Sequence, residues 1–173
     1  MNIRRVSSWK QLKLIKCVLV STIALSLAAC GSNPVNTMNV EGSIQATSIL
    51  NPDVNGGYKP VNLKVYYLQS ESEFSHANFT DLYKRTDKVL GKSILHISTH
   101  QLLPGQTLEI EEEIPAGLKY IGVVAAFRNI KDAQWKAIKA IPEACFFCTG
   151  SGLWDPITIK IDRLSVDLDL GGE

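Results

Sequence analysis

From residue 42 onward, most of the chain alternates between apolar and polar residues with a period of two, which is the pattern of β-strands that bury one face. The clearest run is 61–69, whose apolar face is formed by Val61, Leu63, Val65 and Tyr67. The stretch 118–127 is almost continuously apolar, which is typical of a central strand covered on both faces. Further strands are predicted at 42–50, 94–103, 107–114, 135–141, 157–161 and 165–170.

One segment between these strands has a helical period instead. Phe74 and Ala77 are three residues apart, and Phe79, Leu82 and Tyr83 follow at spacings of three and four, so 70–91 predicts one or two short amphipathic helices packed on a sheet. The expected helix ends are Ser70 and Asn78 as N-caps, Glu73 completing a capping box for the first helix, and Gly91 as the C-terminal stop.

Seven or eight short strands with turn residues between them, interrupted by one helical insertion, predict an all-β fold in which two antiparallel sheets form a β-sandwich. A small β-barrel is the alternative. Three glutamates, Glu111, Glu112 and Glu113, are expected to end the strand that begins at Thr107.

The densest cluster of turn-forming residues separates the first two predicted strands. It consists of Asn51, Pro52, Asp53, Val54, Asn55, Gly56, Gly57, Tyr58, Lys59 and Pro60. The segment is too long for a tight hairpin loop. It is either a solvated connection or a protruding recognition loop, in which Val54 and Tyr58 are apolar contacts among polar residues.

The first 29 residues differ from the rest of the chain. They combine a basic start without acidic residues, an apolar run from 17 to 29 that is shorter than the roughly 20 residues of a membrane span, and the ending Leu27-Ala28-Ala29-Cys30. This pattern predicts a secretory leader that ends in a lipobox, with Cys30 as the lipidation site. An ordinary leader cut elsewhere, or an uncleaved anchor, is the alternative.

The predicted organisation is therefore a leader at 1–29 that is removed, a lipidated flexible tether at 30–41 and a β-sandwich domain at 42–173. Removal of 29 of the 173 residues leaves 144, the size of one domain. Acyl chains on Cys30 would anchor the protein stably. Because Gly31, and not aspartate, follows the cysteine, we expect the inner leaflet of the outer membrane, with the domain in the periplasm.

Charge and chemistry narrow the function further. Five of the 18 basic residues lie in the leader, so the remainder has 13 basic and 17 acidic residues, which argues against a nucleic-acid partner. No catalytic motif is present. His96 and His100 are four residues apart, a weak metal pair in a strand, and an enzyme would need both to converge on a carboxylate. We therefore expect no enzyme activity, no metal and no cofactor besides the lipid.

Two cysteines remain outside the leader and the lipidation site. Cys145 and Cys148 form a C-x-x-C pair in a segment that resembles a loop. In an oxidising periplasm a local disulfide is the favoured interpretation. Reduced thiols without a role, or a redox or metal site, are the alternatives, although no βαβ context and no further ligand pair accompany the motif.

Several segments resemble the TssJ (SciN/VasD) lipoproteins of type VI secretion systems. They are Tyr66-Tyr67-Leu68-Gln69-Ser70, Phe74, Ala77-Asn78-Phe79, Leu82-Tyr83, Val89-Leu90-Gly91, Leu103-Pro104-Gly105, Tyr120-Ile121-Gly122-Val123-Val124-Ala125-Ala126-Phe127-Arg128 and Trp135. The resemblance runs in order from the lipobox to the last strand. It implies a transthyretin-like sandwich of two four-stranded sheets with a short helical addition.

The resemblance also implies a role. Such a lipoprotein faces the periplasm from the outer membrane and binds the C-terminal periplasmic domain of the inner-membrane protein TssM, and with TssL the two form a trans-envelope complex. The family's TssM-contacting loop lies between the first two strands, which is the position of residues 51–59 here. The rival hypothesis is a periplasmic lipoprotein that carries a small apolar ligand inside a sandwich or barrel.

Overall fold

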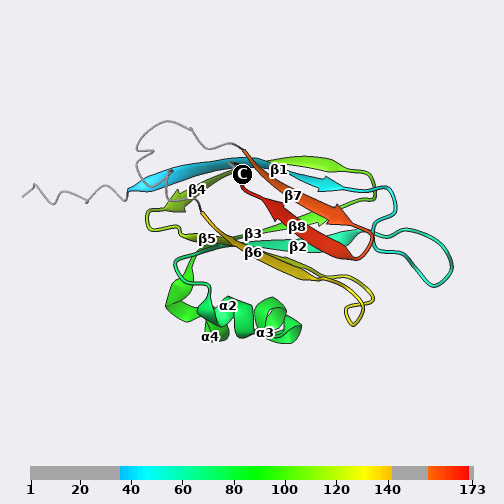
Figure 1. The fold of residues 1–173 in the computed structure, drawn as a ribbon, viewed down its shortest axis with the longest axis horizontal. Helices are drawn as coiled ribbons and strands as arrows, with labels where there is room; N and C mark the ends of the chain where they lie inside the picture. Colours follow the sequence, from blue (N-terminus) through cyan, green and yellow to red (C-terminus); the bar gives the residue numbers. More distant parts are fainter. Residues whose placement is uncertain (1–35, 142–155, 172–173) are drawn as a thin grey trace, which may run out of the picture. The chain divides into compact units, whose positions relative to one another are not determined.

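Within the part of the chain that the structure describes, eight strands make two four-stranded sheets that pack face to face (Figure 1). The computed structural model describes residues 36–141 and 156–171. The first sheet has the order β4-β1-β7-β8, formed by Thr107–Pro115, Thr37–Ala46, Ile157–Asp162 and Ser165–Asp169. The second has the order β3-β2-β5-β6, formed by Ile94–Leu102, Val61–Leu68, Tyr120–Ala125 and Lys136–Ala140. The predicted β-sandwich is confirmed.

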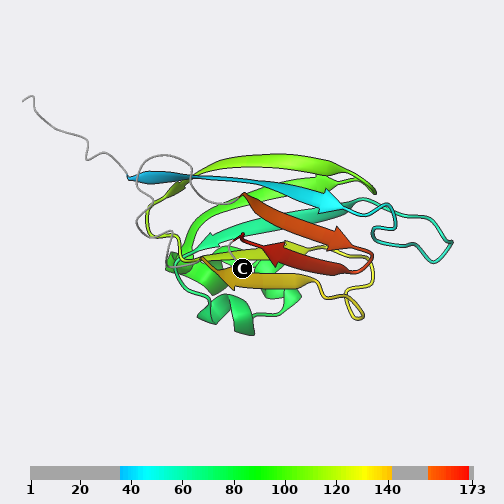
Figure 2. The same cartoon turned by 45° about the horizontal axis from the view of Figure 1, so that its top comes forward.

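The main core lies between the two sheets, as the period-two pattern predicts. Every second residue of β2 and β7 points inward and is buried. Val65, Ile121 and Ile159 are fully buried members of this core, and burial of each such side chain contributes about 1.5–3 kcal/mol. Figure 2 shows the strands of both sheets running along the long axis of the domain.

The first strand differs from its prediction at both ends. β1 begins at Thr37, so residues 37–41, expected in the tether, belong to the strand, while 47–50 lie in the following loop. The early start has a physical reason, because Thr37 pairs with Pro115 of β4 and the Met38 side chain packs against the core. Residues 30–35 of the predicted tether lie outside the described residues.

β1 also pairs with β7 in parallel, so the first sheet is mixed and the prediction of two antiparallel sheets holds only for the second. Gly42 faces Ile157 in this pair. A Cβ atom on Gly42 would lie 2.3 Å from the carbonyl oxygen of Ile157, so glycine is required where the two backbones approach closely.

The glutamate run forms the last part of β4, which ends at Pro115, one residue beyond the predicted strand 107–114. Glu111 and Glu113 are exposed on the outer face of the first sheet, where they pair with Glu41 and Asn39 of β1. Glu112 has the opposite orientation and lies on the side of the core. The predicted strand 107–114 is therefore confirmed to within one residue at its end, and the β1 ladder extends through all three carboxylates.

The helical insertion between β2 and β3 is present but is divided into more pieces than predicted. α2 spans Ser72–His76, α3 Phe79–Lys84 and α4 Thr86–Leu90, and a 3₁₀ turn covers Gly91–Ser93. The Asn78 side chain caps α3 by accepting a hydrogen bond from the Asp81 amide at 3.0 Å, as predicted. The predicted cap at Ser70 is weak, because its hydroxyl is 3.4 Å from the Ser72 amide nitrogen and Glu71 occupies the cap position.

These helices cover the outer face of the second sheet (Figure 1). Phe74 of α2 lies against Gly122 of β5, where a Cβ atom would come within 2.7 Å of the ring. Lys136 of β6 donates hydrogen bonds to the carbonyls of Phe74, Ser75 and Ala77 at 2.7–3.2 Å, and its partial burial lowers its pKa. The second sheet and α2 are thereby fixed to each other.

Candidate protein-binding surface

The 47–60 loop projects from one end of the sandwich and folds back on itself as a small hairpin (Figure 1). Pro52 and Tyr58 form an isolated antiparallel bridge. Inside it, the Asp53 amide donates to the Gly57 carbonyl at 2.6 Å and the Gly56 amide donates to the Asp53 carbonyl at 3.0 Å. Gly56 has a φ of 83°, which suits glycine in a tight turn. The segment is therefore hydrogen-bonded internally and is not an extended connection.

Asn51 fixes the base of this hairpin. Its side chain donates to the Pro60 carbonyl at 2.8 Å and accepts a hydrogen bond from the Arg128 amide at 2.9 Å. Its own amide donates to the Arg163 carbonyl at 2.9 Å. The residue is 1% exposed, so the side chain predicted to bind a partner lies inside the protein and holds the loop instead.

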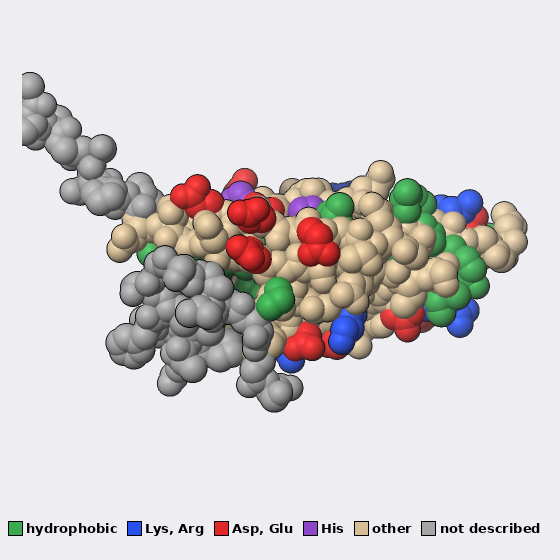
Figure 3. All heavy atoms as spheres, turned by 90° about the horizontal axis from the view of Figure 1, so that it is seen from above, with side chains coloured by type: hydrophobic (Ala, Val, Ile, Leu, Met, Phe, Trp, Pro, Cys, Tyr) green, Lys and Arg blue, Asp and Glu red, His purple; other side chains and the backbone are tan. Residues whose placement is uncertain are grey.

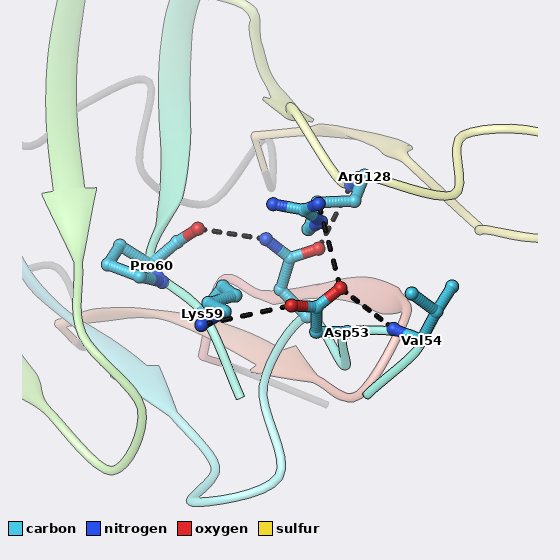
Figure 4. A network of polar contacts seen from close by, with 6 residues as sticks. Asp53, Val54, Lys59, Pro60 and Arg128 are labelled. Carbon is cyan, nitrogen blue, oxygen red and sulfur yellow. Dashed lines mark hydrogen bonds and ion pairs between the residues drawn. The ribbon is translucent and has the colours of Figure 1, made fainter. Parts of the chain in front are cut away.

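The charges of the loop are arranged around one carboxylate. Asp53 has a side chain that is only 14% exposed, and it lies between the Lys59 ammonium at 3.8 Å and the Arg128 guanidinium at 3.6 Å (Figure 4). It also accepts a hydrogen bond from the Val54 amide at 2.8 Å. Two cations therefore surround one anion, and both cations remain about half exposed.

Large apolar side chains are exposed at the same end of the molecule. Among the described residues, the exposed large hydrophobic side chains are Val54 at 97%, Leu103 at 53%, Tyr58 at 48% and Ile49 at 40%. We call these four the apolar end surface. Three lie on the loop, and Leu103 lies on the turn between β3 and β4. Figure 3 shows hydrophobic side chains gathered toward this end, with basic side chains beside them.

The sequence prediction covered only part of this surface. Of the predicted contacts, Val54, Asn55, Gly56, Tyr58 and Lys59 are exposed, and Pro52, Asp53 and Gly57 are half-buried. The prediction did not include Ile49 and Leu103 of the apolar end surface, nor Arg128, which contacts the loop at Asp53. A leucine directly before Pro104-Gly105 is a detectable signal, because turn positions favour polar residues.

A separate cluster of polar side chains, which we call the polar seam, lies between strands β3 and β4 and includes both histidines. Its members are His96, Ser98, His100 and Glu112. β3 and β4 are edge strands of opposite sheets, and the His96 imidazole lies 3.2 Å from the Glu112 carboxylate across the gap. His100 contacts the Ser98 hydroxyl at 3.0 Å, and desolvation lowers its pKa although Glu112 acts in the opposite direction. The described residues contain no group of three or more potential ligands that could hold a metal ion.

Tyr67 completes this seam. Its phenol is buried and, within the part of the chain that the structure describes, makes no hydrogen bond of normal geometry. Burial raises the pKa of the Tyr67 phenol, while the nearby Ser98 hydroxyl acts in the opposite direction and the Glu112 carboxylate adds to the increase. The seam joins the two sheets through polar groups of β2, β3 and β4.

Some predicted sites lie outside the described residues. These are the lipidation site Cys30 and the pair Cys145 and Cys148. Among the residues at 36–141 and 156–171, no helix is long and apolar enough to cross a membrane.

The family assignment comes from the sequence. Residues 38–164 match the family model T6SS-SciN, described as type VI secretion lipoprotein, VasD, EvfM, TssJ. The chain belongs to this family of type VI secretion lipoproteins. The match covers β1 to the turn before β8 and so includes the whole apolar end surface. No curated protein matches the chain.

Solved structures show the same fold. The T6SS lipoprotein TssJ1 from Pseudomonas aeruginosa is 22% identical with a TM-score of 0.68, over 79% of this chain and 98% of that one. Serratia marcescens Lip, a membrane-bound component of the type VI secretion system, is 23% identical with a TM-score of 0.68, over 78% and 99%. A chain in the structure described as the TssM C-terminal domain from EAEC is 18% identical with a TM-score of 0.59, over 75% and 96%.

Proposed function

We propose that this chain is an outer-membrane lipoprotein that anchors the trans-envelope complex of a type VI secretion system. Acyl chains on Cys30 hold it in the inner leaflet, and its domain binds the periplasmic C-terminal domain of TssM, within a complex that includes TssL. Its membership of the type VI secretion lipoprotein family supports this role. So does its similarity to chains in structures described as a type VI membrane complex and as the TssM C-terminal domain.

The observation that carries the proposal is the exposure of apolar side chains on a rigidly mounted loop. Val54 is 97% exposed although it is flanked by polar residues, and Tyr58 is about half exposed. Exposed apolar groups on a protruding element are typical of protein interfaces. Because hydrogen bonds from Asn51 and within the hairpin order the loop before binding, association loses less conformational entropy.

The direction of β1 suits such an anchor. Cys30 precedes Thr37, and the strand then runs ten residues, or about 33 Å, before the loop begins at the other end of the sandwich (Figure 1). The apolar end surface therefore lies at the end of the sandwich opposite to the start of β1 at Thr37, where it is available to a periplasmic partner.

The interior formed by residues 36–141 and 156–171 is filled with side chains, which does not favour the ligand-carrier hypothesis. Fully buried large side chains, including Tyr66, Phe74 and Ile114, occupy the cores between the sheets and under the helices. We therefore do not propose a carrier function.

Calorimetry tests the proposal. The full chain, purified in detergent, is titrated with the periplasmic C-terminal domain of TssM encoded in the same genome. The test variant replaces residues 53–58 by glycine and serine but keeps Asn51, and the control is Glu41→Gln on the outer face of the first sheet. We expect wild type and control to bind and the loop variant to lose binding without a matching loss of melting temperature. Equal binding by all three would refute the loop as the interface.

A further inference from the structure

The turn between β3 and β4 carries an apolar residue in an unusual position. Leu103 is 53% exposed, more than Tyr58, while the preceding Leu102 is fully buried. The turn is well ordered, because the Leu103 amide donates to the Gln106 side chain at 2.9 Å and the Gln106 amide donates to the Leu103 carbonyl at 3.1 Å. The hydrogen bonds of the turn therefore fix Leu103 in an exposed position, and packing within the described residues does not explain why an apolar side chain is placed there.

This turn is joined to the base of the 47–60 loop. The Gly105 amide donates to the Thr47 carbonyl at 3.0 Å, and the Ala46 amide donates to the Gln106 carbonyl at 2.8 Å. A Cβ atom added at Gly105, whose φ is 75°, would lie 3.9 Å from the Cα and Cβ atoms of Ser48, so the turn and the loop are close neighbours here. Two segments separated by more than 40 residues in the sequence therefore form one hydrogen-bonded unit, and their exposed apolar side chains are fixed to the same end of the sandwich.

The charges beside this surface indicate the character of the partner. Lys59 and Arg128 both contact the single carboxylate of Asp53, so these three side chains together carry a net charge of +1, and both basic side chains are about half exposed. A protein surface complementary to this end therefore has an apolar groove with acidic groups at its rim.

We propose that the β3–β4 turn is a second part of the partner-binding surface, and that Leu103 enters the same acid-rimmed apolar groove of the protein partner as the loop does. This inference rests on the proposed function, because it uses the same partner domain. It enlarges the interface from one loop to two segments, each of which connects the two sheets. A single loop bound alone would leave an exposed leucine beside the contact without any role.

Calorimetry of Leu103 variants of the full chain in detergent, against the same TssM domain, tests this inference. We expect Leu103→Ser to weaken binding by about tenfold or more, the effect of removing one buried apolar anchor, while Leu103→Met stays within about threefold of wild type. Leu103→Glu should weaken binding more than Leu103→Lys, because a carboxylate is repelled by an acidic rim. Since Leu103 is half exposed, all four variants should melt close to wild type.

The outcomes separate the two proposals. If wild type binds and the 53–58 replacement does not, but Leu103→Ser binds like wild type, the loop is the interface and the turn is not part of it. If Leu103→Lys loses as much affinity as Leu103→Glu, the acidic rim is wrong. If wild type itself does not bind, the proposed function fails, and this inference fails with it.

Discussion

Replacement of Asn51 by alanine tests whether the loop is held by its base. Asn51 has a φ of 47°, in the left-handed region that asparagine tolerates better than alanine. Its buried side chain connects the segments of Pro60 and Arg128, while its backbone N–H donates separately to the Arg163 carbonyl. Asn51→Ala removes both side-chain hydrogen bonds and keeps the unfavourable backbone angle.

The expected loss follows from these contacts. Each of the two part-buried hydrogen bonds contributes about 1 kcal/mol, and its loss costs about 2 kcal/mol where the partner is left unsatisfied. Alanine at a positive φ adds about 1 kcal/mol. The free energy of unfolding should therefore fall by about 3–5 kcal/mol in Asn51→Ala. Asn51→Gly loses the same hydrogen bonds but relieves the backbone, so it should be about 1 kcal/mol less destabilised than alanine.

Urea denaturation of wild type and both variants, followed by tryptophan fluorescence, measures these differences. A loss below about 1 kcal/mol in Asn51→Ala would show that the segments of Pro60 and Arg128 do not depend on this side chain. A glycine variant no more stable than the alanine variant would contradict the backbone part of the argument.

Two further predictions concern the rest of the fold. Gly122→Ala should cost about 1–3 kcal/mol in urea denaturation, because its Cβ atom would overlap the Phe74 ring and lift α2 from the sheet; a neutral effect would contradict this packing. The lowered pKa of His100 means that the folded state binds its proton less readily than the unfolded state, so stability is lost as pH falls below about 6.5. As the pH is lowered, the melting temperature should fall less in His100→Gln than in wild type, and by the same amount as wild type in the exposed variant His76→Gln. An equal fall in all three proteins would refute this explanation of the pH dependence.

Local sequence patterns predicted the elements of this fold well. The alternation in 61–69 gave β2 to within one residue at its end, and the helical period in 70–91 located the insertion. Asn78 was a correct cap because a capping hydrogen bond involves only residues three apart. Each of these features depends on neighbours in the sequence.

Long-range pairing was not predictable in the same way. The start of β1 at Thr37 and its parallel pairing with β7 depend on strands that lie far along the chain. The same holds for Leu103 and Arg128, which come from two different connections and reach the loop only in the folded structure. A run of turn residues marks a loop, but it does not show which other segments share its surface.

Crosslinking in the cell envelope tests the central claim most directly. A photoreactive amino acid is introduced at Val54 on the loop or, as a control, at Asp167, an exposed residue on the outer face of β8. After irradiation of intact cells that carry the secretion system, we predict a covalent adduct with TssM from position 54 and none from position 167. An adduct from position 167 without one from position 54 would contradict the account, because the partner would then bind the sheet and not the loop.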